Sequence, residues 1–333
     1  EDAGIRREDV FQVCVVGNTC MHHLFLGISP ASLVHAPYTP AVSERLVLNA
    51  GDYGLAVQER AELIMLSDIA GYVGADTCGC LLAIRQDLRE EISLMIDIGT
   101  NGEMVLGNRE RMVTCSIAAG PAFEGAKIEC GMRGAAGAVD HVKYEDGKWN
   151  YTTVGNKPAV GLCGSGLIDL VAGLLDAGML DENGVLRSGQ EKQGVFILVL
   201  PERGGNERGV YLTQKDLGEV QLAKAAIAAG IQMLMERLGI TEDDICSVYI
   251  AGAFGNYMDP VSAGKIGLFP ATLVKKVKPV GNAAGEGAKI ALVNEKEMLE
   301  MDELVRKIEF VELAASADFQ DHFIDELGFE TGE

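Results

Sequence analysis

The 333-residue sequence lacks several features that mark particular classes of protein. Its eight cysteines contain no C-x-x-C pair, so they do not have the spacing of a zinc or iron–sulfur site. Basic residues are scarce, with 28 against 49 acidic residues, and the net charge of −21 repels nucleic acid and anionic membranes. The longest strongly apolar stretch, residues 225–235, is too short to span a bilayer. We therefore expect a cytoplasmic protein with reduced thiols that binds neither nucleic acid nor membrane.

Common phosphate-binding and nucleophile motifs are also absent. No G-x-x-x-x-G-K-[ST] run occurs, which argues against a P-loop. The glycines within residues 134–139 do not open a helix after a strand, so a Rossmann site is not expected. The segment around Ser165 resembles a nucleophile elbow, but Cys163 stands where that motif needs glycine, and only His322 follows as a base. A serine hydrolase is therefore not expected.

Glycine, by contrast, is abundant, at 41 of 333 residues. Glycine-rich turns follow strand-like segments at four places, which are residues 17–19, 99–102, 252–255 and 281–287. A fifth cluster, residues 164–166, opens a predicted helix. Backbone N–H groups in such turns and at helix N-termini bind anions, so several of them together predict a nucleotide site. Tight connections between elements are the alternative explanation for some of these glycines.

The most informative of these turns lies within "LMIDIGTNGEMVLGN", residues 94–108. Asp97 interrupts a run of buried-type residues just before the turn. The turn itself consists of Gly99, Thr100, Asn101 and Gly102. A charge in a buried strand is costly unless something pairs with it or coordinates it. A plain β-hairpin explains the Asn-Gly pair, whereas a phosphate-binding hairpin explains both the turn and the aspartate. On these residues alone, both interpretations stay open.

The spacing of apolar residues predicts alternating strands and helices. Three antiparallel strands are expected in succession, at residues 93–98, 103–108 and 111–118. The longest helix is expected to be capped by Thr213 and closed by Gly239, and a final helix to be capped by Ser316. His22 and His23 are adjacent on another predicted helix, so their rings diverge and a metal site built on them is not expected.

Five motifs in the second part of the chain follow one another in a fixed order. They are "DIGTNGE" at 97–103, "AAGPAFEGAKIECGMRG" at 118–134, "GLCGSGLIDL" at 161–170, "AGAFGNY" at 251–257 and "VGNAAGEGAK" at 280–289. In this order they closely resemble the C-terminal domain of the reductive activators of corrinoid proteins. Upstream, "VVGNTCMHHLFLGISP" and "AGYVGADT" look like the same family, so the resemblance covers nearly the whole chain.

That family belongs to the acetate and sugar kinase, heat-shock chaperone and actin superfamily. The resemblance implies an α/β fold with ribonuclease-H-like lobes, in which mixed sheets flanked by helices surround an ATP cleft. It implies that residues 1–90 are the end of the first lobe and a connecting segment, and that residues 91–333 are the second lobe with its adenosine-binding turn. Full-length members also carry an upstream phosphate hairpin and a plant-type 2Fe–2S ferredoxin domain, neither of which is in this sequence. We therefore expect the C-terminal part of a longer protein, with no cluster of its own.

The same resemblance implies a set of site residues. The implied phosphate hairpin contains Asp97, Gly99, Thr100, Asn101 and Gly102, and the implied adenosine turn contains Gly252, Ala253, Phe254 and Gly255. The helix opening adds Gly164, Ser165 and Gly166 as expected nucleotide-binding residues. Asp97 would hold Mg²⁺ through water, and Asp97 and Glu124, a carboxylate within residues 120–127, are the expected catalytic residues. Glu124 would orient water or Mg²⁺, unless it is a loop carboxylate that makes local hydrogen bonds. Lys127 and Arg133 either contact phosphate or are surface charges.

The function implied by the resemblance is that of an ATP-binding, ATPase domain in a protein that returns Co(II) corrinoid proteins to Co(I). Its partner would be the corrinoid protein, with a low-potential electron donor acting through the missing iron–sulfur domain. ATP can assist only by binding one conformation better than another. Two alternatives remain, a small-molecule kinase of the same superfamily and a non-catalytic module that docks a corrinoid protein. A homodimer is also left open.

Overall fold

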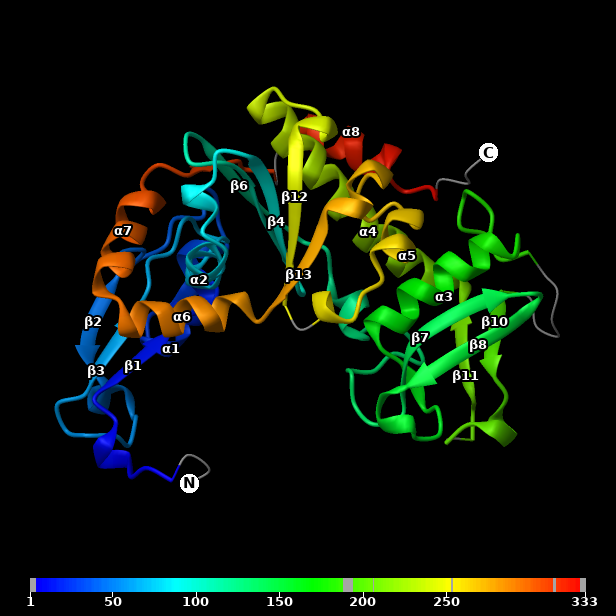
Figure 1. The fold of residues 1–333 in the computed structure, drawn as a ribbon, viewed down its shortest axis with the longest axis horizontal. Coiled ribbons are helices and arrows are strands. Elements are labelled where there is room, and N and C mark those ends of the chain that lie inside the picture. The colour runs from blue at the N-terminus through cyan, green and yellow to red at the C-terminus, as the bar shows by residue number, and fades with distance from the viewer. Residues whose placement is uncertain (1–3, 188–193, 206, 253, 314–315, 330–333) are drawn as a thin grey trace. The chain divides into compact units, whose positions relative to one another are not determined.

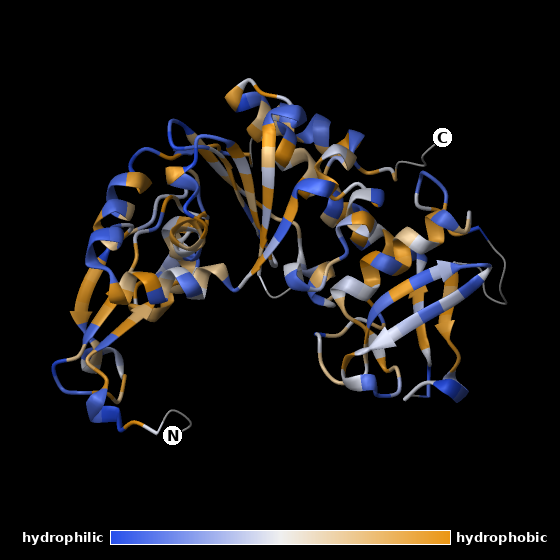
Figure 2. Cartoon of the chain, in the orientation of Figure 1, coloured by the Kyte–Doolittle hydropathy of each residue, from blue (hydrophilic) through white to orange (hydrophobic). Residues whose placement is uncertain are grey.

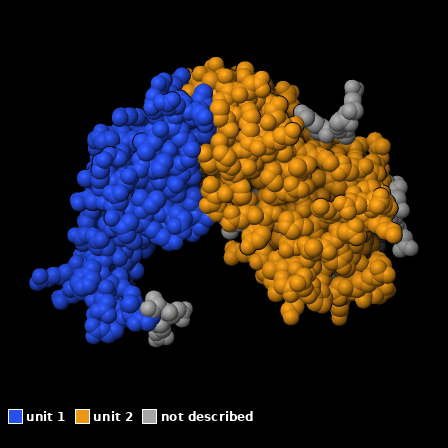
Figure 3. Space-filling view, viewed as in Figure 1, with its two compact units in different colours: residues 1–94, 105–116, 282–311 blue, residues 95–104, 117–281, 312–333 orange. Residues whose placement is uncertain are grey.

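The computed structural model describes residues 4–187, 194–205, 207–252, 254–313 and 316–329 (Figure 1). The chain divides into two compact units (Figure 3). The first holds residues 1–94, 105–116 and 282–311, and the second holds residues 95–104, 117–281 and 312–333. Each unit combines strands with helices, and the predicted α/β class is confirmed. Among the helices in the described ranges, none has both the length and the apolar character needed to cross a bilayer.

The first unit contains a sheet of three short strands. They are β1 (Gln12–Val15), β2 (Leu46–Asn49) and β3 (Glu62–Met65), in the order β1-β3-β2. β1 runs parallel to β3, and β2 runs antiparallel to it. β3 supplies much of the local core, because Leu63 and Met65 are almost completely buried against partly buried residues of β1 and β2. The helices of this unit are α1 (Thr19–Phe25), α2 (Ala75–Ile84), α6 (Ala283–Val293) and α7 (Glu295–Val305).

Helices α2 and α6 pack closely in the first unit, and glycine makes that packing possible. A Cβ on Gly287 would lie 1.8 Å from the carbonyl oxygen of Gly79, and a Cβ on Gly79 would lie 2.6 Å from that of Ala284. Only residues without a Cβ allow two backbones to approach this closely. Asn282 caps α6 by accepting a hydrogen bond from the Gly285 N–H at 3.0 Å. Within the 281–287 cluster, Gly287 thus serves helix packing and Gly285 takes part in the helix cap.

The largest sheet has six strands in the order β13-β12-β4-β5-β6-β14. They are β4 (Ile92–Ile98), β5 (Gly102–Gly107), β6 (Met112–Ile117), β12 (Ile245–Ala251), β13 (Val277–Gly281) and β14 (Glu309–Phe310). The central strands β4 and β12 are mainly apolar (Figure 2), and residues 94–96 are fully buried. The three strands predicted at 93–98, 103–108 and 111–118 correspond to β4, β5 and β6, apart from one or two residues at their ends.

The remaining strands lie in the second unit and form two smaller sheets. One contains β7 (Ala138–Glu145), β8 (Lys148–Thr153) and β9 (Gly161–Leu162), and the other contains β10 (Val195–Val199) and β11 (Val210–Thr213). The helices are α3 (Gly164–Asp176), α4 (Gln214–Leu238), α5 (Pro260–Lys265) and α8 (Ala317–Asp325).

The three predicted helix caps are confirmed. The Asp216 N–H donates to Thr213 Oγ1 at 3.2 Å, and the Thr213 N–H donates back to Asp216 Oδ2 at 2.9 Å, which closes a capping box at the start of α4. Gly239 ends the same helix in the left-handed conformation, with φ +69°. Ser316 caps α8 by accepting from the Phe319 N–H at 3.2 Å.

Candidate functional site

Asp97 and Gly252 lie side by side at one end of the six-stranded sheet. They stand at the ends of β4 and β12, which are neighbouring central strands. A Cβ on Gly252 would lie 3.0 Å from Asp97 Oδ1 and 3.4 Å from the carbonyl oxygen of Ile98. Because their carboxyl ends meet, the two strands run in the same direction. The prediction that both strands are central in one sheet is confirmed, and their turns start at the same end of it.

Asp97 is half-buried, whereas Ile96 and Ile98 on either side of it are buried. Successive side chains of a strand point to opposite faces, so the aspartate leaves the sheet on the face opposite to these two isoleucines. Its carboxylate therefore retains contact with solvent, which reduces the cost of its charge. Gly252 beside it has φ +90°, a conformation that favours glycine.

The turn after β4 is joined to a segment more than twenty residues downstream. Thr100 Oγ1 donates a hydrogen bond to Glu124 Oε1 at 2.7 Å. The Gly120 N–H donates to the carbonyl oxygen of Thr100 at 2.9 Å, just before the short 3₁₀ helix η5 (Pro121–Glu124). A Cβ on Gly99 would lie 3.7 Å from Glu124 Oε1, so the carboxylate lies beside the turn. The structure thus brings together Thr100, Gly99 and Glu124, three of the predicted site residues.

The other charged residues of the same motif have different surroundings. Lys127 Nζ forms an ion pair with Glu219 Oε2 of α4 at 3.2 Å. Arg133 lies on an exposed part of the chain. Gly102, at the end of the hairpin turn, packs against Ile117, and a Cβ there would lie 2.9 Å from Ile117 Cγ1. Because Lys127 is already paired with Glu219 of α4, a contact between Lys127 and phosphate would compete with this ion pair.

The predicted adenosine turn follows β12 directly. The Gly252 N–H donates to the carbonyl oxygen of Gly281 at 2.9 Å, which ties the start of the turn to the end of β13. Residues Phe254–Asn256 form a short 3₁₀ helix, η9. Gly255 is buried, and a Cβ there would lie 2.6 Å from Ile250 Cγ2, so the turn folds back over β12. Ala253, also predicted for this site, lies outside the described residues.

The cluster Gly164, Ser165 and Gly166 lies at the start of α3, where this helix packs against β7. A Cβ on Gly166 would lie 2.2 Å from the carbonyl oxygen of Val139. Ser165 is 2% exposed, and its hydroxyl donates to the carbonyl oxygen of Asp140 at 2.8 Å. These contacts explain why residues 164–166 are small, because α3 packs closely against β7 at this point. A role of this cluster in nucleotide binding stays a prediction.

Asp169, one turn further along α3, is a buried carboxylate that the sequence pattern did not single out. It is 4% exposed, and its Oδ2 lies 3.1 Å from His141 Nδ1 and accepts from the Val142 N–H at 3.3 Å. Burial raises the pKa of the Asp169 carboxyl, and the hydrogen bonds that it accepts oppose that rise. The available signal was the same as for Asp97, a lone aspartate within an apolar run.

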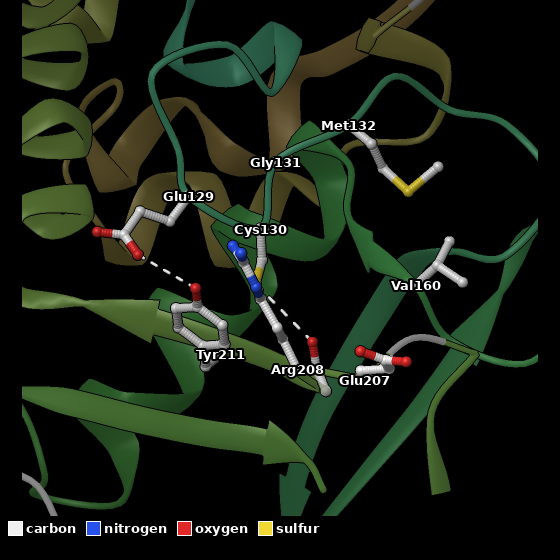
Figure 4. Close-up of a pocket in the computed structure, with 9 residues that line it drawn as sticks. Glu129, Cys130, Gly131, Met132, Val160, Glu207, Arg208 and Tyr211 are labelled. Atoms are coloured by element: carbon white, nitrogen blue, oxygen red, sulfur yellow. Dashed lines mark hydrogen bonds between the residues drawn. The ribbon is translucent and has the colours of Figure 1, made fainter. Parts of the chain in front are cut away.

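A cavity of about 380 Å³ lies elsewhere in the second unit. Its walls include the segment 129–132, Val160, Arg208 just before β11 and Tyr211 within β11 (Figure 4). The Tyr211 hydroxyl donates to Glu129 Oε2 at 3.1 Å across one side of it. The predicted nucleotide-site residues do not line this cavity. Nor, among the residues that the structure describes, do three or more His, Cys, Asp or Glu side chains gather as a direct metal site.

Comparison with known families identifies the chain. A family model described as the C-terminal domain of RACo, the ASKHA domain, matches residues 91–333. The chain belongs to the RACo family. A second model of that family, the RACo middle region, matches residues 1–89. The membership predicted from the five ordered motifs is confirmed, and so is the superfamily fold.

Two named relatives and a solved structure are similar to the chain over most of its length. The chain is 35% identical over 337 residues to the corrinoid activation enzyme RamQ of Eubacterium limosum, which covers 97% of this chain and 56% of RamQ. It is 28% identical over 303 residues to the [Co(II) methylated amine-specific corrinoid protein] reductase of Methanosarcina barkeri. This match covers 84% of this chain and 54% of the reductase. A solved structure, the reductive activator for corrinoid, iron–sulfur protein, superposes on the chain with a TM-score of 0.91 at 37% identity. The superposition covers 98% of this chain and 54% of the solved one. The chain thus spans about half the length of these relatives.

Proposed function

We propose that this chain is the ATP-binding part of a reductive activator that returns Co(II) corrinoid proteins to the Co(I) state. The named relatives are a corrinoid activation enzyme and a Co(II) methylated amine-specific corrinoid protein reductase, which supports this class of activity. The observation that carries the nucleotide part is the convergence of Asp97, Gly252 and the Thr100–Glu124 pair beside the ends of β4 and β12. Residues 1–90 would be the end of the first lobe, and residues 91–333 the second.

The residues beside Asp97 fit a hydrated Mg²⁺ ion and phosphate. Carboxylate oxygen is a ligand that Mg²⁺ prefers, and this ion usually keeps several waters when it binds one or two carboxylates and phosphates. The glycine at position 252 leaves free the space that a Cβ would occupy 3.0 Å from Asp97 Oδ1. Backbone N–H groups of the turn 99–102 would bind phosphate oxygens. The metal would offset the negative charge of the phosphates during phosphoryl transfer.

Glu124 is the candidate base for hydrolysis in this proposal. Its Oε1 is held by the Thr100 hydroxyl, so the carboxylate is oriented beside the turn that would carry the phosphates. The oxygen of a water molecule would form a bond to the γ-phosphorus while the bond from that phosphorus to the bridging oxygen of ADP breaks. Glu124 would accept the proton that the water loses. Thr100 is then a positioning residue.

ATP would favour a conformation of the activator that fits the Co(II) form of its corrinoid partner. A nucleotide can shift such an equilibrium only by binding one conformation better than the other. The electron itself would come from a low-potential donor through an iron–sulfur domain outside these 333 residues.

The experiment that tests this function uses the full-length protein, a corrinoid protein in its Co(II) form and a chemical reductant. We expect the visible spectrum to change to that of Co(I) only when Mg-ATP is present. Calorimetry on the activator alone should detect ATP binding that depends on Mg²⁺. Reduction at the same rate and extent without ATP would overturn the proposal. ATP-dependent labelling of a small acceptor instead of phosphate release would support the kinase alternative.

A further inference from the structure

Helix α1 has its polar residues inside and its apolar residues outside. Thr19, His22 and His23 are 0%, 5% and 1% exposed. The outward residues are Met21, Leu24 and Phe25, which are exposed by 60%, 63% and 37%. A helix on the surface of a globular domain normally has the opposite arrangement, with its apolar stripe facing the core. We call Met21, Leu24 and Phe25 the α1 apolar face.

Hydrogen bonds fix the helix in this orientation. The Ala41 N–H donates to His23 Nε2 at 2.9 Å, so the ring proton of neutral His23 is on Nδ1, which donates to the carbonyl oxygen of Thr19 at 2.7 Å. His22 Nδ1 lies 3.2 Å from Oδ2 of Asp68, which is 2% exposed. Turning the helix to bury its apolar side would break all of these bonds. The outward orientation is therefore built into the fold.

The surroundings of α1 add to this surface. The Phe25 ring stacks on Tyr53, with ring centroids 6.1 Å apart and an angle of 11° between the planes. Helix α1 contacts the 3₁₀ helix η2 (Pro30–Leu33), and Val34, which follows η2, is 68% exposed. Exposed apolar side chains gathered on one part of a surface are typical of interaction sites.

We propose that the α1 apolar face is covered by a further segment of the same polypeptide, one that lies outside these 333 residues and offers apolar side chains. Three of the relatives that match nearly the whole chain or most of it are about twice as long. The family model that begins at residue 1 describes a middle region, so α1 lies within the first 25 residues of the matched part. A segment of the same chain is present at high effective concentration. A second copy is disfavoured, since each carries a net charge of −21.

Two exposed cysteines allow a direct test. Cys20 lies on α1 beside the apolar face, and Cys246 lies in the second unit as an internal reference. The full-length protein is labelled with a maleimide, and peptide mass spectrometry follows each cysteine over time. We expect Cys20 to react about tenfold or more slowly than Cys246, because a covering segment must open before the thiol is reached. Equal rates would overturn the proposal.

The other occupants give different results in the same assay. Protection of Cys20 that disappears on hundredfold dilution of the protein would assign the face to a second copy. Protection that requires added corrinoid protein would assign it to that partner. Either outcome contradicts the proposal, and neither depends on ATP binding, so the proposed function is tested separately.

A pair of variants checks that the face itself is responsible. Leu24→Asp in the full-length protein should raise the labelling rate of Cys20 to near that of Cys246 and lower the melting temperature. Val293→Asp is the matched control, because Val293 at the end of α6 is 86% exposed. It should change neither measurement. If Leu24→Asp does not fold, Leu24→Ser provides a smaller change with the same expected direction, and an unchanged labelling rate in the folded variant would contradict the proposal.

Discussion

Thr100 and Glu124 are joined by a 2.7 Å hydrogen bond from Thr100 Oγ1 to Glu124 Oε1, which links the turn after β4 to the segment η5. The Gly120 N–H strengthens this link by donating to the Thr100 carbonyl oxygen. The first bond orients the exposed carboxylate, and the second ties the loop that carries it to the turn. A carboxylate that must accept a proton from water benefits from such positioning, because a small displacement lowers the rate.

Replacing Thr100 should therefore impair turnover more than binding. In the full-length protein, Thr100→Val removes the hydroxyl at nearly constant volume, and we expect kcat for ATP hydrolysis to fall about tenfold or more with little change in KM. Thr100→Ser keeps the donor and should restore most of the rate. Thr152→Val is the matched control, since Thr152 also donates to a carboxylate, Asp140, but in the β7–β8 pair. Equal kcat values for Thr100→Val and wild type would show that the bond to Glu124 has no catalytic role.

Adding a single methyl group at Gly252 should weaken nucleotide binding while the protein still folds. Gly252→Ala would place a Cβ 3.0 Å from Asp97 Oδ1, and its φ of +90° would be strained as well. Gly178→Ala shares a positive φ, +64°, but nothing lies within 4 Å of its Cβ position. We expect each variant to lose about 1–2 kcal/mol of stability from the backbone strain. Only Gly252→Ala should weaken ATP binding in calorimetry, and equal binding by the two variants would contradict the site.

Local features of this fold could be predicted from the sequence because their causes are local. The cap residues Thr213, Gly239 and Ser316 act on backbone groups within a few positions, so their residue types indicate helix ends directly. The strand that contains Asp97 and the turn that follows it could also be predicted, since the residues concerned are consecutive. Family membership followed from the order of the motifs.

Pairings between distant segments could not be predicted in this way. The glycines at 164–166 carry the same signal whether they bind phosphate or let α3 approach β7, and the structure explains them by packing. Asp169 was missed because its partner His141 lies on another element. The outward face of α1 was missed because periodicity identifies an apolar side without saying which way it points.

Asp169 should make part of the stability of the protein depend on pH. Burial raises the pKa of its carboxyl above the ordinary value of 3.8, so the folded protein keeps a proton that the unfolded chain has already lost. The stabilisation from this proton is fully present below pH 3.8 and is lost as the pH rises through the raised pKa. The free energy of unfolding should therefore contain a term that falls with rising pH in this window.

Asp169→Asn isolates that term, because the amide cannot ionise but can still accept the hydrogen bonds from His141 and Val142. Urea unfolding from pH 4 to 7 should show the stability of the variant rising relative to wild type as the pH increases. Asp68 and Asp76 also have raised pKa values caused by burial, but both proteins contain them, so their contributions cancel in the difference. Parallel curves for the two proteins would contradict a raised pKa at Asp169.

Asp97 is the residue whose replacement most directly tests the site. Asp97→Asn keeps the shape of the side chain and removes the charge that would hold the waters of a bound Mg²⁺ ion. In the full-length protein we expect ATP turnover to fall by about a hundredfold or more, comparable with the loss of one well-placed electrostatic contact. Folding should be nearly unchanged, because the side chain is half-buried and contributes little to the apolar core.

A purely structural role for Asp97 predicts the reverse, normal ATP turnover with a modest fall in melting temperature. Steady-state hydrolysis and thermal unfolding on the same samples therefore separate the two roles. Asp52→Asn is the matched control, since Asp52 is an exposed aspartate in the first unit and should alter neither measurement. The Mg²⁺ dependence adds a further distinction. If Asp97 holds the hydrated ion, the remaining activity of Asp97→Asn should need a higher Mg²⁺ concentration for half-maximal rate. Wild-type turnover at the wild-type Mg²⁺ requirement would show that the aspartate serves the hairpin alone.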